Sequence, residues 1–221
     1  MARVVITGGN RGIGSELANA YAAAGDEVIL GIRNPEAVGA SAYELLPLDV
    51  GSDDSVAAFA QLLDDRPVDI LINNAGIIGP ERQSVRDADF DGFLQTLNVN
   101  TVGPLRVTQA LLPNLEASTG AKVVIISSRM GSLSGAETSQ LAYRASKAAV
   151  NKLARGLATE LTPTGIIVAS LHPGWVRTDM GGAGADISPQ ESSQGIKTVI
   201  DQLRPDNSGR FWNFDGSELD W

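Results

Sequence analysis

The apolar segments of this sequence constrain its fold most strongly, because most of them run without alternation of apolar and polar residues. A strand that is apolar throughout is buried on both faces, as in a parallel sheet covered by helices on both sides. We therefore predict an α/β fold of the Rossmann type, with a doubly wound parallel β-sheet of about seven strands and helices on both faces. The expected strands are Arg3–Thr7, Val28–Ile32, Tyr43–Leu48, Val68–Ile72, Val123–Ile126, Ile166–Leu171 and Gly209–Asn213.

Stretches with helical periodicity separate most of these strands. Ser52 and the acidic residues after it suit a helix N-terminus, and Pro189 suits the first turn of the last helix. A weak helical patch follows Pro35, and the glycine-rich segment Thr178–Ser188 is either a plain loop or a lid. The 221 residues suffice for a single domain, residues 1–221, with a substantial core. The expected helices are Ile13–Ala24, Ser52–Leu63, Asp87–Leu97, Val99–Leu115, Leu141–Leu161 and Pro189–Leu203.

The composition excludes several classes of protein. Cysteine is absent, so the chain has no disulfide and no thiolate nucleophile. The single histidine, His172, rules out a histidine-cluster metal site, and we expect no metal. The 26 acidic against 17 basic residues give a formal net charge of -9, which disfavours nucleic acid as a partner. No leader sequence and no apolar run long enough to span a membrane is recognisable, so we expect a cytoplasmic protein without membrane contact.

A glycine-rich turn between the first expected strand and helix indicates a phosphate-binding loop. Its sequence is TGGNRGIG, at Thr7–Gly14. Glycines here permit a tight turn and close approach of the backbone to a pyrophosphate, which N–H groups of the helix N-terminus then bind. The alternative is a turn without a ligand, but the strand–turn–helix context favours a dinucleotide site. The candidate residues are Thr7, Gly8, Asn10, Arg11, Gly12, Ile13 and Gly14.

The residues after the second strand favour NADP(H) over NAD(H). An NAD site needs a carboxylate there for the ribose 2′-hydroxyl, whereas an NADP site needs a cation for the 2′-phosphate. Ile32 and Arg33 occupy this position, and Asp26 lies at the opposite end of the strand. Arg11, in the glycine turn, is a second cation for the same phosphate. In the alternative interpretation, Arg33 is a solvated surface residue.

Tyr143 and Lys147 lie four residues apart in the longest helical stretch, on one face of the expected helix. A lysine ammonium beside a phenol favours the phenolate, so we expect the pKa of Tyr143 to lie below its ordinary value of about 10. Such a tyrosine can serve as a general acid or base at a carbonyl group. In isolation the pair is more often a surface feature than a catalytic one.

Seven motifs follow one another along the chain and settle that choice. They are TGGNRGIG at Thr7–Gly14, LDV at Leu48–Val50, NNAG at Asn73–Gly76, NVNTVG around Asn100, ISS at Ile126–Ser128, YRASK at Tyr143–Lys147 and HPGWVRTDM at His172–Met180. In this order they resemble the short-chain dehydrogenase/reductase family across essentially the whole chain. The RNP after the second strand and the final GRFWNFDGSELDW are similar to carbonyl-reductase members of the C-factor type.

The resemblance implies a role for each matched position. Tyr143 would be the general acid and base, and Lys147 would lower its pKa and bind the nicotinamide ribose. Ser128 would orient the substrate carbonyl. Asn100, which in isolation is more often a helix N-cap, would hold a water in a proton relay to Lys147. Further cofactor contacts would come from Asp49, Val50, Asn74, Ala75, Gly76, Pro173, Gly174, Val176 and Thr178.

The family's chemistry predicts an NADPH-dependent carbonyl reductase that transfers hydride to an aldehyde or ketone. Two alternatives stay open: a non-catalytic NADP-binding regulator or sensor, and an NAD-dependent alcohol dehydrogenase. The partner would be a small carbonyl or alcohol substrate, and the resemblance leaves room for a homodimer or homotetramer. The segment between Ser128 and Tyr143 is longer than is usual in the family. Other serines therefore compete for the role of Ser128, namely Ser127, Ser132 and Ser134.

Overall fold

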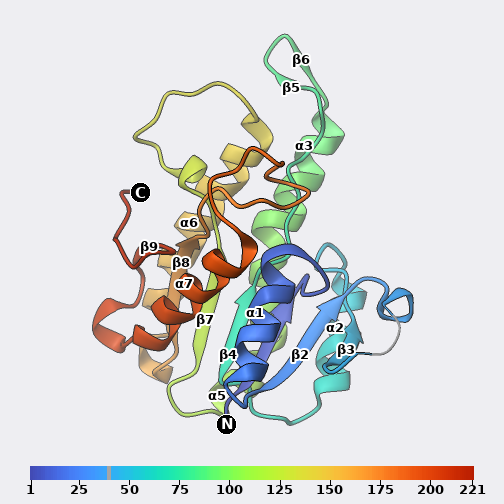
Figure 1. Cartoon of the computed structure of the whole chain (residues 1–221), viewed down its shortest axis with the longest axis vertical. Helices are drawn as coiled ribbons and strands as arrows, with labels where there is room; N and C mark the ends of the chain where they lie inside the picture. The colour runs from blue at the N-terminus through green and yellow to red at the C-terminus, as the bar shows by residue number, and fades with distance from the viewer. Residues whose placement is uncertain (39–40) are drawn as a thin grey trace.

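A seven-stranded sheet lies at the centre of the computed structural model, which describes residues 1–38 and 41–221 (Figure 1). Across the sheet the order is β3 (Glu44–Pro47), β2 (Glu27–Ile32), β1 (Arg3–Thr7), β4 (Ile70–Asn73), β7 (Lys122–Ile126), β8 (Ile167–His172) and β9 (Phe211–Asn213). All neighbouring strands pair in parallel. The chain builds the sheet outward from β1 in both directions, which confirms the predicted doubly wound topology. The carboxyl ends of β1 and β4 therefore form a switch point, where such folds bind ligands.

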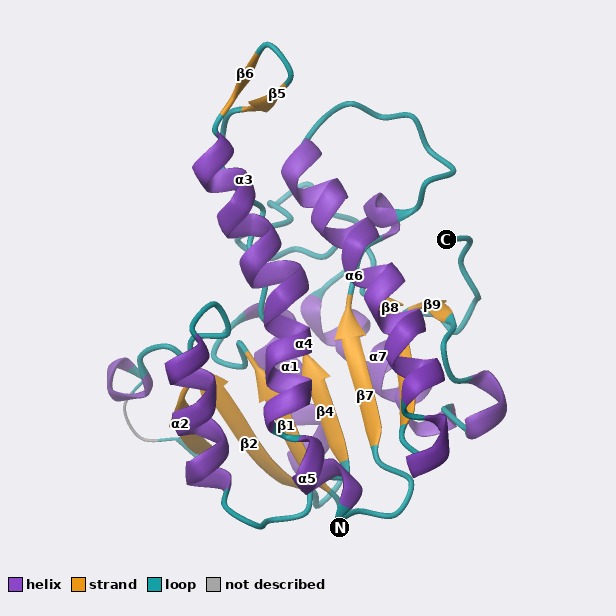
Figure 2. Cartoon of the chain, turned by 180° about the vertical axis from the view of Figure 1, so that it is seen from behind, coloured by secondary structure: helices purple, strands orange, loops and turns teal. Residues whose placement is uncertain are grey.

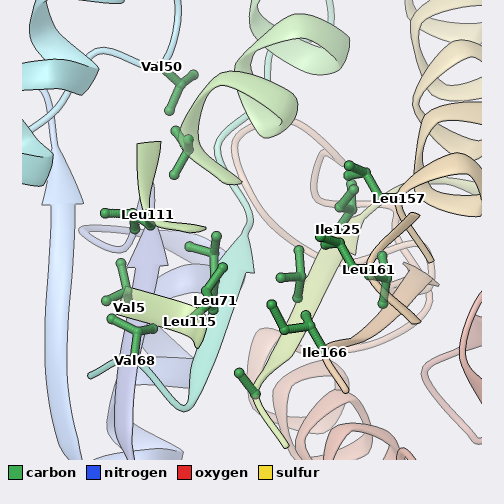
Figure 3. Close-up of a cluster of buried hydrophobic side chains, with 14 of the residues drawn as sticks. Val5, Val50, Val68, Leu71, Leu111, Leu115, Ile125, Leu157, Leu161 and Ile166 are labelled. Carbon is green, nitrogen blue, oxygen red and sulfur yellow. The ribbon is translucent and has the colours of Figure 1, made fainter. Parts of the chain in front are cut away.

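Helices cover both faces of the sheet (Figure 2). One face carries α1 (Gly12–Ala23) and α7 (Pro189–Gln202), and the other carries α2 (Asp53–Leu63), α4 (Gly103–Ala110), α5 (Leu112–Glu116) and α6 (Leu141–Glu160). Successive strand residues point to opposite faces of the sheet. Val4 belongs to the buried cluster under α1 and α7. Val5 belongs to the buried cluster on the other face, together with Leu111 and Leu157 (Figure 3). Within the described residues, no helix combines the length and apolarity needed to cross a bilayer.

The segment that follows β4 differs from the prediction at its start. The expected helix Asp87–Leu97 begins later, as α3 (Phe90–Leu97), because its first residues form β6 (Asp87–Ala88). This strand pairs with β5 (Gln83–Ser84) in a small antiparallel hairpin, which stands at the outer end of α3 (Figure 1). Asp89 then begins α3 as its N-cap, since its carboxylate accepts a hydrogen bond from the N–H of Gly92 at 3.0 Å. Strands of two residues carry no periodicity that a sequence could reveal.

The expected helix Val99–Leu115 is also divided differently. A π-helical turn at Asn98–Val102 joins α3 to α4 without a break, and Leu111 separates α4 from α5. Asn100 thus lies inside a continuous helical segment, which excludes its interpretation as an N-cap. Pro113 lies at the start of α5, where its missing N–H removes a bond that would otherwise continue α4. π-Helical turns often mark functional sites.

Phe59 tests how the α2 layer is held on the sheet. Its side chain is fully buried, whereas Leu62 on the same helix is 50% exposed. Phe59→Ala should lower the free energy of unfolding by about 3–5 kcal/mol, because a large buried ring is lost and a cavity remains. Leu62→Ala should change it by no more than about 0.5 kcal/mol. Equal losses in denaturant titrations of the two variants would contradict this packing.

Candidate functional site

A cavity of about 830 Å³ lies at the carboxyl ends of the central strands. Its wall includes residues that directly follow β1, β2, β4, β7 and β8, so the switch point of the sheet forms its floor. Most of the predicted site residues line it: Gly8, Asn10, Arg11, Gly12, Ile13, Gly14, Arg33, Asp49, Val50, Asn74, Ala75, Gly76, Tyr143, Lys147, Pro173 and Thr178. The predicted residues outside this wall are Thr7, Asn100, Ser128, Gly174 and Val176.

The glycine turn presents free backbone donors to this cavity. Helix α1 has no side-chain cap and no acidic residue in its first turn, so its first N–H groups are available to an anion. A Cβ at Gly14 would lie 2.6 Å from both Asn74 Nδ2 and the Gly8 carbonyl oxygen, which leaves room only for glycine. Gly12 has a positive φ of 56°, which favours glycine for its backbone shape. The turn therefore fits a phosphate group.

Thr7 and Asn74 hold the turn from behind. The hydroxyl of Thr7 accepts hydrogen bonds from the backbone N–H groups of Asn74 and Ala75, both at 3.0 Å. The side-chain amide of Asn74 donates to the carbonyl oxygens of Thr7 and Gly8 at 2.9 and 3.0 Å. These bonds fasten β4 to the turn after β1, so both residues shape the cavity through its backbone.

Two other predicted residues are also structural. Gly174 has a φ of 85°, and a Cβ there would lie 2.5 Å from the side chain of Ile187 and 3.1 Å from Phe214. Val176 is buried and forms an isolated β-bridge with Ile187. Both residues therefore fix the segment after β8, and Pro173 and Thr178 are the predicted members of that segment that line the cavity.

The two arginines predicted for a 2′-phosphate have different surroundings. Arg33 is exposed at the edge of the cavity, directly after β2. Arg11 makes an ion pair with Asp179 at 2.8 Å, which joins the glycine turn to the segment after β8. Their side chains are 71% and 81% exposed, so this pair is weak and leaves Arg11 able to exchange partners.

Helix α6 brings Tyr143 and Lys147 to the wall of the same cavity. Both side chains are buried, with 9% and 5% of their surface exposed. The Lys147 ammonium donates a hydrogen bond to the carbonyl oxygen of Ile126, the last residue of β7, at 2.8 Å. Its Nζ lies 5.6 Å from the centre of the Tyr143 ring. The predicted pair is therefore a buried feature and not a surface one.

The expected direction of the Tyr143 pKa shift is wrong for this structure. Burial raises the pKa of Tyr143 above its ordinary value, and a hydrogen bond with the Ser128 hydroxyl offsets only part of that rise. Burial also lowers the pKa of Lys147 to about 8. The ammonium is directed at the Ile126 carbonyl, so desolvation outweighs its effect on the phenol. Tyr143 is accordingly a protonated phenol at neutral pH.

Ser128 is distinguished from the competing serines by its surroundings. It is buried two residues after the end of β7 and interacts with Tyr143. The hydroxyl of Ser127 instead donates to Asn151 Oδ1 at 2.6 Å. Ser132 and Ser134 are bonded to each other at 2.9 Å in an exposed pair. The structure thus brings Ser128, and not its neighbours, to the tyrosine.

Asn100 is buried, and both ends of its side-chain amide are hydrogen-bonded. Its Oδ1 accepts from the N–H of Ile77 at 2.8 Å, and its Nδ2 donates to the Ile77 carbonyl at 2.8 Å and to Ser146 Oγ at 3.0 Å. A Cβ at Gly76 would lie 3.3 Å from Asn100 Oδ1 and 3.8 Å from Lys147 Nζ. Glycine at this position therefore keeps the space between these two polar atoms free of carbon.

His172 is buried, and its pKa is lowered to about 4, first by burial and then by the charge of Arg129, so it is a neutral structural imidazole.

Gln83, which the sequence analysis did not identify, accepts hydrogen bonds from the backbone N–H groups of Ala142 and Tyr143. It lies 60 residues before Tyr143 and belongs to no motif, so no local signal marks it.

Known proteins resemble this chain in sequence and structure. The family model described as short chain dehydrogenase matches residues 2–186. The C-signal protein of Myxococcus xanthus is 44% identical over 165 residues, which cover 74% of this chain and 99% of that protein. The 1-hydroxy-2-glutathionyl-2-methyl-3-butene dehydrogenase of Rhodococcus sp. (strain AD45) is 35% identical over the full length of both chains.

Solved structures agree with the sequence matches. The NADPH-bound carbonyl reductase from chicken fatty liver superposes with a TM-score of 0.91 at 30% identity, covering 100% of this chain and 99% of that one. A carbonyl reductase from Pseudomonas aeruginosa PAO1 in complex with NADP gives a TM-score of 0.86 at 33% identity, with both chains covered completely.

Gly14→Ala tests the fit of the glycine turn. The added methyl group must displace the Gly8 carbonyl or the Asn74 amide, so we expect the dissociation constant for a bound dinucleotide to rise about tenfold or more. Gly156→Ala, on α6, meets no atom within 4 Å and should leave binding unchanged while stabilising the helix by up to ~1 kcal/mol. Fluorescence titration with NADPH measures both variants. Unchanged binding in Gly14→Ala would contradict the assignment.

Proposed function

The chain belongs to the short-chain dehydrogenase family, and we propose that it is an NADPH-dependent oxidoreductase that reduces an aldehyde or ketone to an alcohol. One observation carries the proposal: a cavity with an anion-binding turn at one wall holds a buried, protonated Tyr143 at the other, beside Ser128. A phenol that keeps its proton at neutral pH suits the reductive direction, in which the product oxygen must be protonated.

The choice of NADP(H) rests on the charges near the end of β2. Arg33 follows this strand at the edge of the cavity, and Arg11 lies in the glycine turn. A carboxylate at this position would repel a 2′-phosphate, whereas guanidinium groups bind phosphate in a bidentate manner. Asp49, the nearest carboxylate after β3, accepts a hydrogen bond from the N–H of Gly51 at 2.9 Å. The NADPH and NADP bound to the similar carbonyl reductases support the same choice.

The proposed chemistry assigns one task to each side chain around the carbonyl group. The nicotinamide, when bound, supplies the hydride. The Ser128 hydroxyl orients the carbonyl oxygen and stabilises the negative charge that develops on it. Tyr143 donates its proton to that oxygen. Lys147, held by the Ile126 carbonyl, stabilises the phenolate that Tyr143 becomes, because a cation favours the charged form of a neighbouring acid.

The proton of Tyr143 must then be replaced. Gly76 leaves a small space between Asn100 Oδ1 and Lys147 Nζ, and a water with these two polar partners would fit there. Both Nδ2 protons of Asn100 are already donated to Ile77 and Ser146, so the amide is fixed and offers only its oxygen to such a water. This arrangement supports the proposed relay through Lys147.

A non-catalytic signalling role is the alternative that one relative favours, since a protein named C-signal is 44% identical to this chain. A protein that only binds a dinucleotide has no use for a buried phenol, a buried ammonium and a serine directed at one point. NAD-dependent alcohol oxidation remains the second alternative. Oxidation of NADPH with a panel of aldehydes, ketones and quinones separates these functions: turnover supports the reductase, and binding without turnover supports the sensor.

Tyr143→Phe tests the proton donor. Removing the hydroxyl should lower kcat by about 10²-fold or more, while the dissociation constant for NADPH changes by less than about twofold. Tyr43→Phe is the matched control, because the Tyr43 hydroxyl bonds to Asn19 on the surface at 2.5 Å. A loss of less than about tenfold in Tyr143→Phe would overturn the assigned role.

Arg33→Glu tests the phosphate discriminator. The exchange of a cation for a carboxylate should raise KM for NADPH by about tenfold or more and leave KM for NADH within about threefold. Arg86→Glu, at the exposed tip of the β5–β6 hairpin, makes the same charge change away from the cavity. Parallel changes for NADPH and NADH in Arg33→Glu would argue against a 2′-phosphate site.

The rate of reduction should depend on the charge of Lys147. Its lowered pKa makes Lys147 a cation below a pH of about 8 and neutral above it. Tyr143 keeps its proton over this range because burial raises its pKa. We therefore expect kcat/KM to fall as the pH rises through about 8, and Lys147→Arg to abolish that fall in whatever activity remains. A rate that is constant across this pH would contradict the role of the ammonium.

A further inference from the structure

The start of helix α6 is held from outside the helix. Gln140, its N-cap, has a left-handed backbone with a φ of 55° and makes no side-chain capping bond. The N–H groups of Ala142 and Tyr143, the second and third residues of the helix, instead donate to Oε1 of Gln83 at 2.9 and 3.2 Å. These are the two donors that an N-cap side chain ordinarily satisfies. Gln83 therefore replaces the missing cap from the β5–β6 hairpin.

The other end of the Gln83 amide is also fully engaged. Its Nε2 donates to the carbonyl oxygens of Ile78 and Pro80 at 3.1 and 2.7 Å. The turn between them is shaped around the amide: Gly79 has a φ of 90°, and a Cβ there would lie 3.3 Å from Gln83 Nε2. Both donors of this side chain are thus used, and its oxygen accepts twice. A side chain bonded in this way has one orientation.

These bonds close a ring around the catalytic tyrosine. The segment that is hydrogen-bonded to Gln83, Ile78–Pro80, directly follows Ile77. The N–H of Ile77 donates to Asn100 Oδ1 at 2.8 Å. Asn100 Nδ2 donates to Ser146 Oγ at 3.0 Å, and Ser146 Oγ donates to the Tyr143 carbonyl at 2.7 Å. Gln83 holds the N–H of the same tyrosine. Both backbone polar groups of Tyr143 are therefore linked to the segment after β4, the N–H through Gln83 and the carbonyl through Ser146 and Asn100.

We propose that Gln83 is a positioning residue of this site, which fixes the first turn of α6 and thereby places the Tyr143 hydroxyl against the substrate carbonyl. The inference rests on the proposed reductase function for its kinetic readout, but not for its structural one. Gln83 does not itself line the cavity, and its hydrogen bonds go only to the start of α6 and to the segment after β4, so it acts through these two segments. Misplacement of a reacting group by about 1 Å can cost about 10²-fold in rate.

Three variants test the proposal. Gln83→Leu keeps the bulk of the side chain and removes all four hydrogen bonds. Gln83→Glu keeps an oxygen that can accept from the N–H groups of Ala142 and Tyr143. It replaces the amide NH₂ with a carboxylate oxygen, which cannot donate to the carbonyls of Ile78 and Pro80. Gln140→Ala is the matched control, since this glutamine lies at the same helix end without a side-chain cap. NADPH oxidation gives kcat and KM, fluorescence titration gives the dissociation constant for NADPH, and hydrogen exchange reports the Ala142 and Tyr143 amides.

We expect Gln83→Leu to lower kcat by about 10- to 100-fold, with KM and NADPH affinity within about threefold of the parent. The Ala142 and Tyr143 amides should exchange faster. Gln83→Glu should recover part of kcat and of the amide protection, and Gln140→Ala should match the parent. A kcat within threefold of the parent in Gln83→Leu would overturn the proposal, as would an equal loss of kcat and NADPH affinity, which indicates general disruption.

The exchange measurement separates this inference from the proposed function. If the parent protein turns over no carbonyl compound, the reductase proposal fails, and the exchange of the two amides still decides whether Gln83 fixes the helix. Unchanged exchange in Gln83→Leu would then refute the positioning role. If Gln83→Leu does not fold, Gln83→Glu gives the same comparison with a side chain of the same length.

Discussion

The hydrogen bond from the Lys147 ammonium to the Ile126 carbonyl organises the candidate active site. An ammonium buried at this depth is costly unless its donors are satisfied, so the end of β7 and the first turns of α6 have to meet at this point. That contact sets where Tyr143 lies one turn earlier on the same helix, and it places Ser128 two residues beyond Ile126. The tyrosine and serine thus come together because one buried charge requires a carbonyl oxygen.

The electrostatics of the site favour donation of a proton. The chain as a whole has a formal net charge of -9, yet the charged residues that line the cavity are mostly cations: Arg11, Arg33, Lys147 and Arg177, with Asp49 and Asp179 as the carboxylates. Burial keeps Tyr143 protonated and brings the pKa of Lys147 near the physiological range. A phenol with a raised pKa and an ammonium with a lowered one form a pair in which the proton can be passed on and then restored. Desolvation, more than attraction between the two groups, sets these values.

The strands, the glycine turn and the Tyr143–Lys147 pair could be predicted from the sequence because each has a local cause. Apolar runs follow from burial on both faces, and glycines follow from close backbone approach. The β5–β6 hairpin and the π-helical turn at Asn98–Val102 could not, since neither has a pattern of its own. The direction of the Tyr143 pKa shift depends on burial, which is a property of the folded chain. Gln83 and the Arg11–Asp179 pair depend on contacts between residues 60 and 168 positions apart.

The proposed function requires the cavity to bring a hydride donor and a proton donor to one carbonyl group. The most direct test uses NADPH that carries deuterium at the transferred position of the nicotinamide, with a carbonyl compound that the protein reduces. Mass spectrometry of the alcohol should show one deuterium on the former carbonyl carbon, and the product made by Tyr143→Phe should be formed far more slowly with the same label. An alcohol without deuterium, or NADPH oxidation that forms no alcohol, would contradict the account.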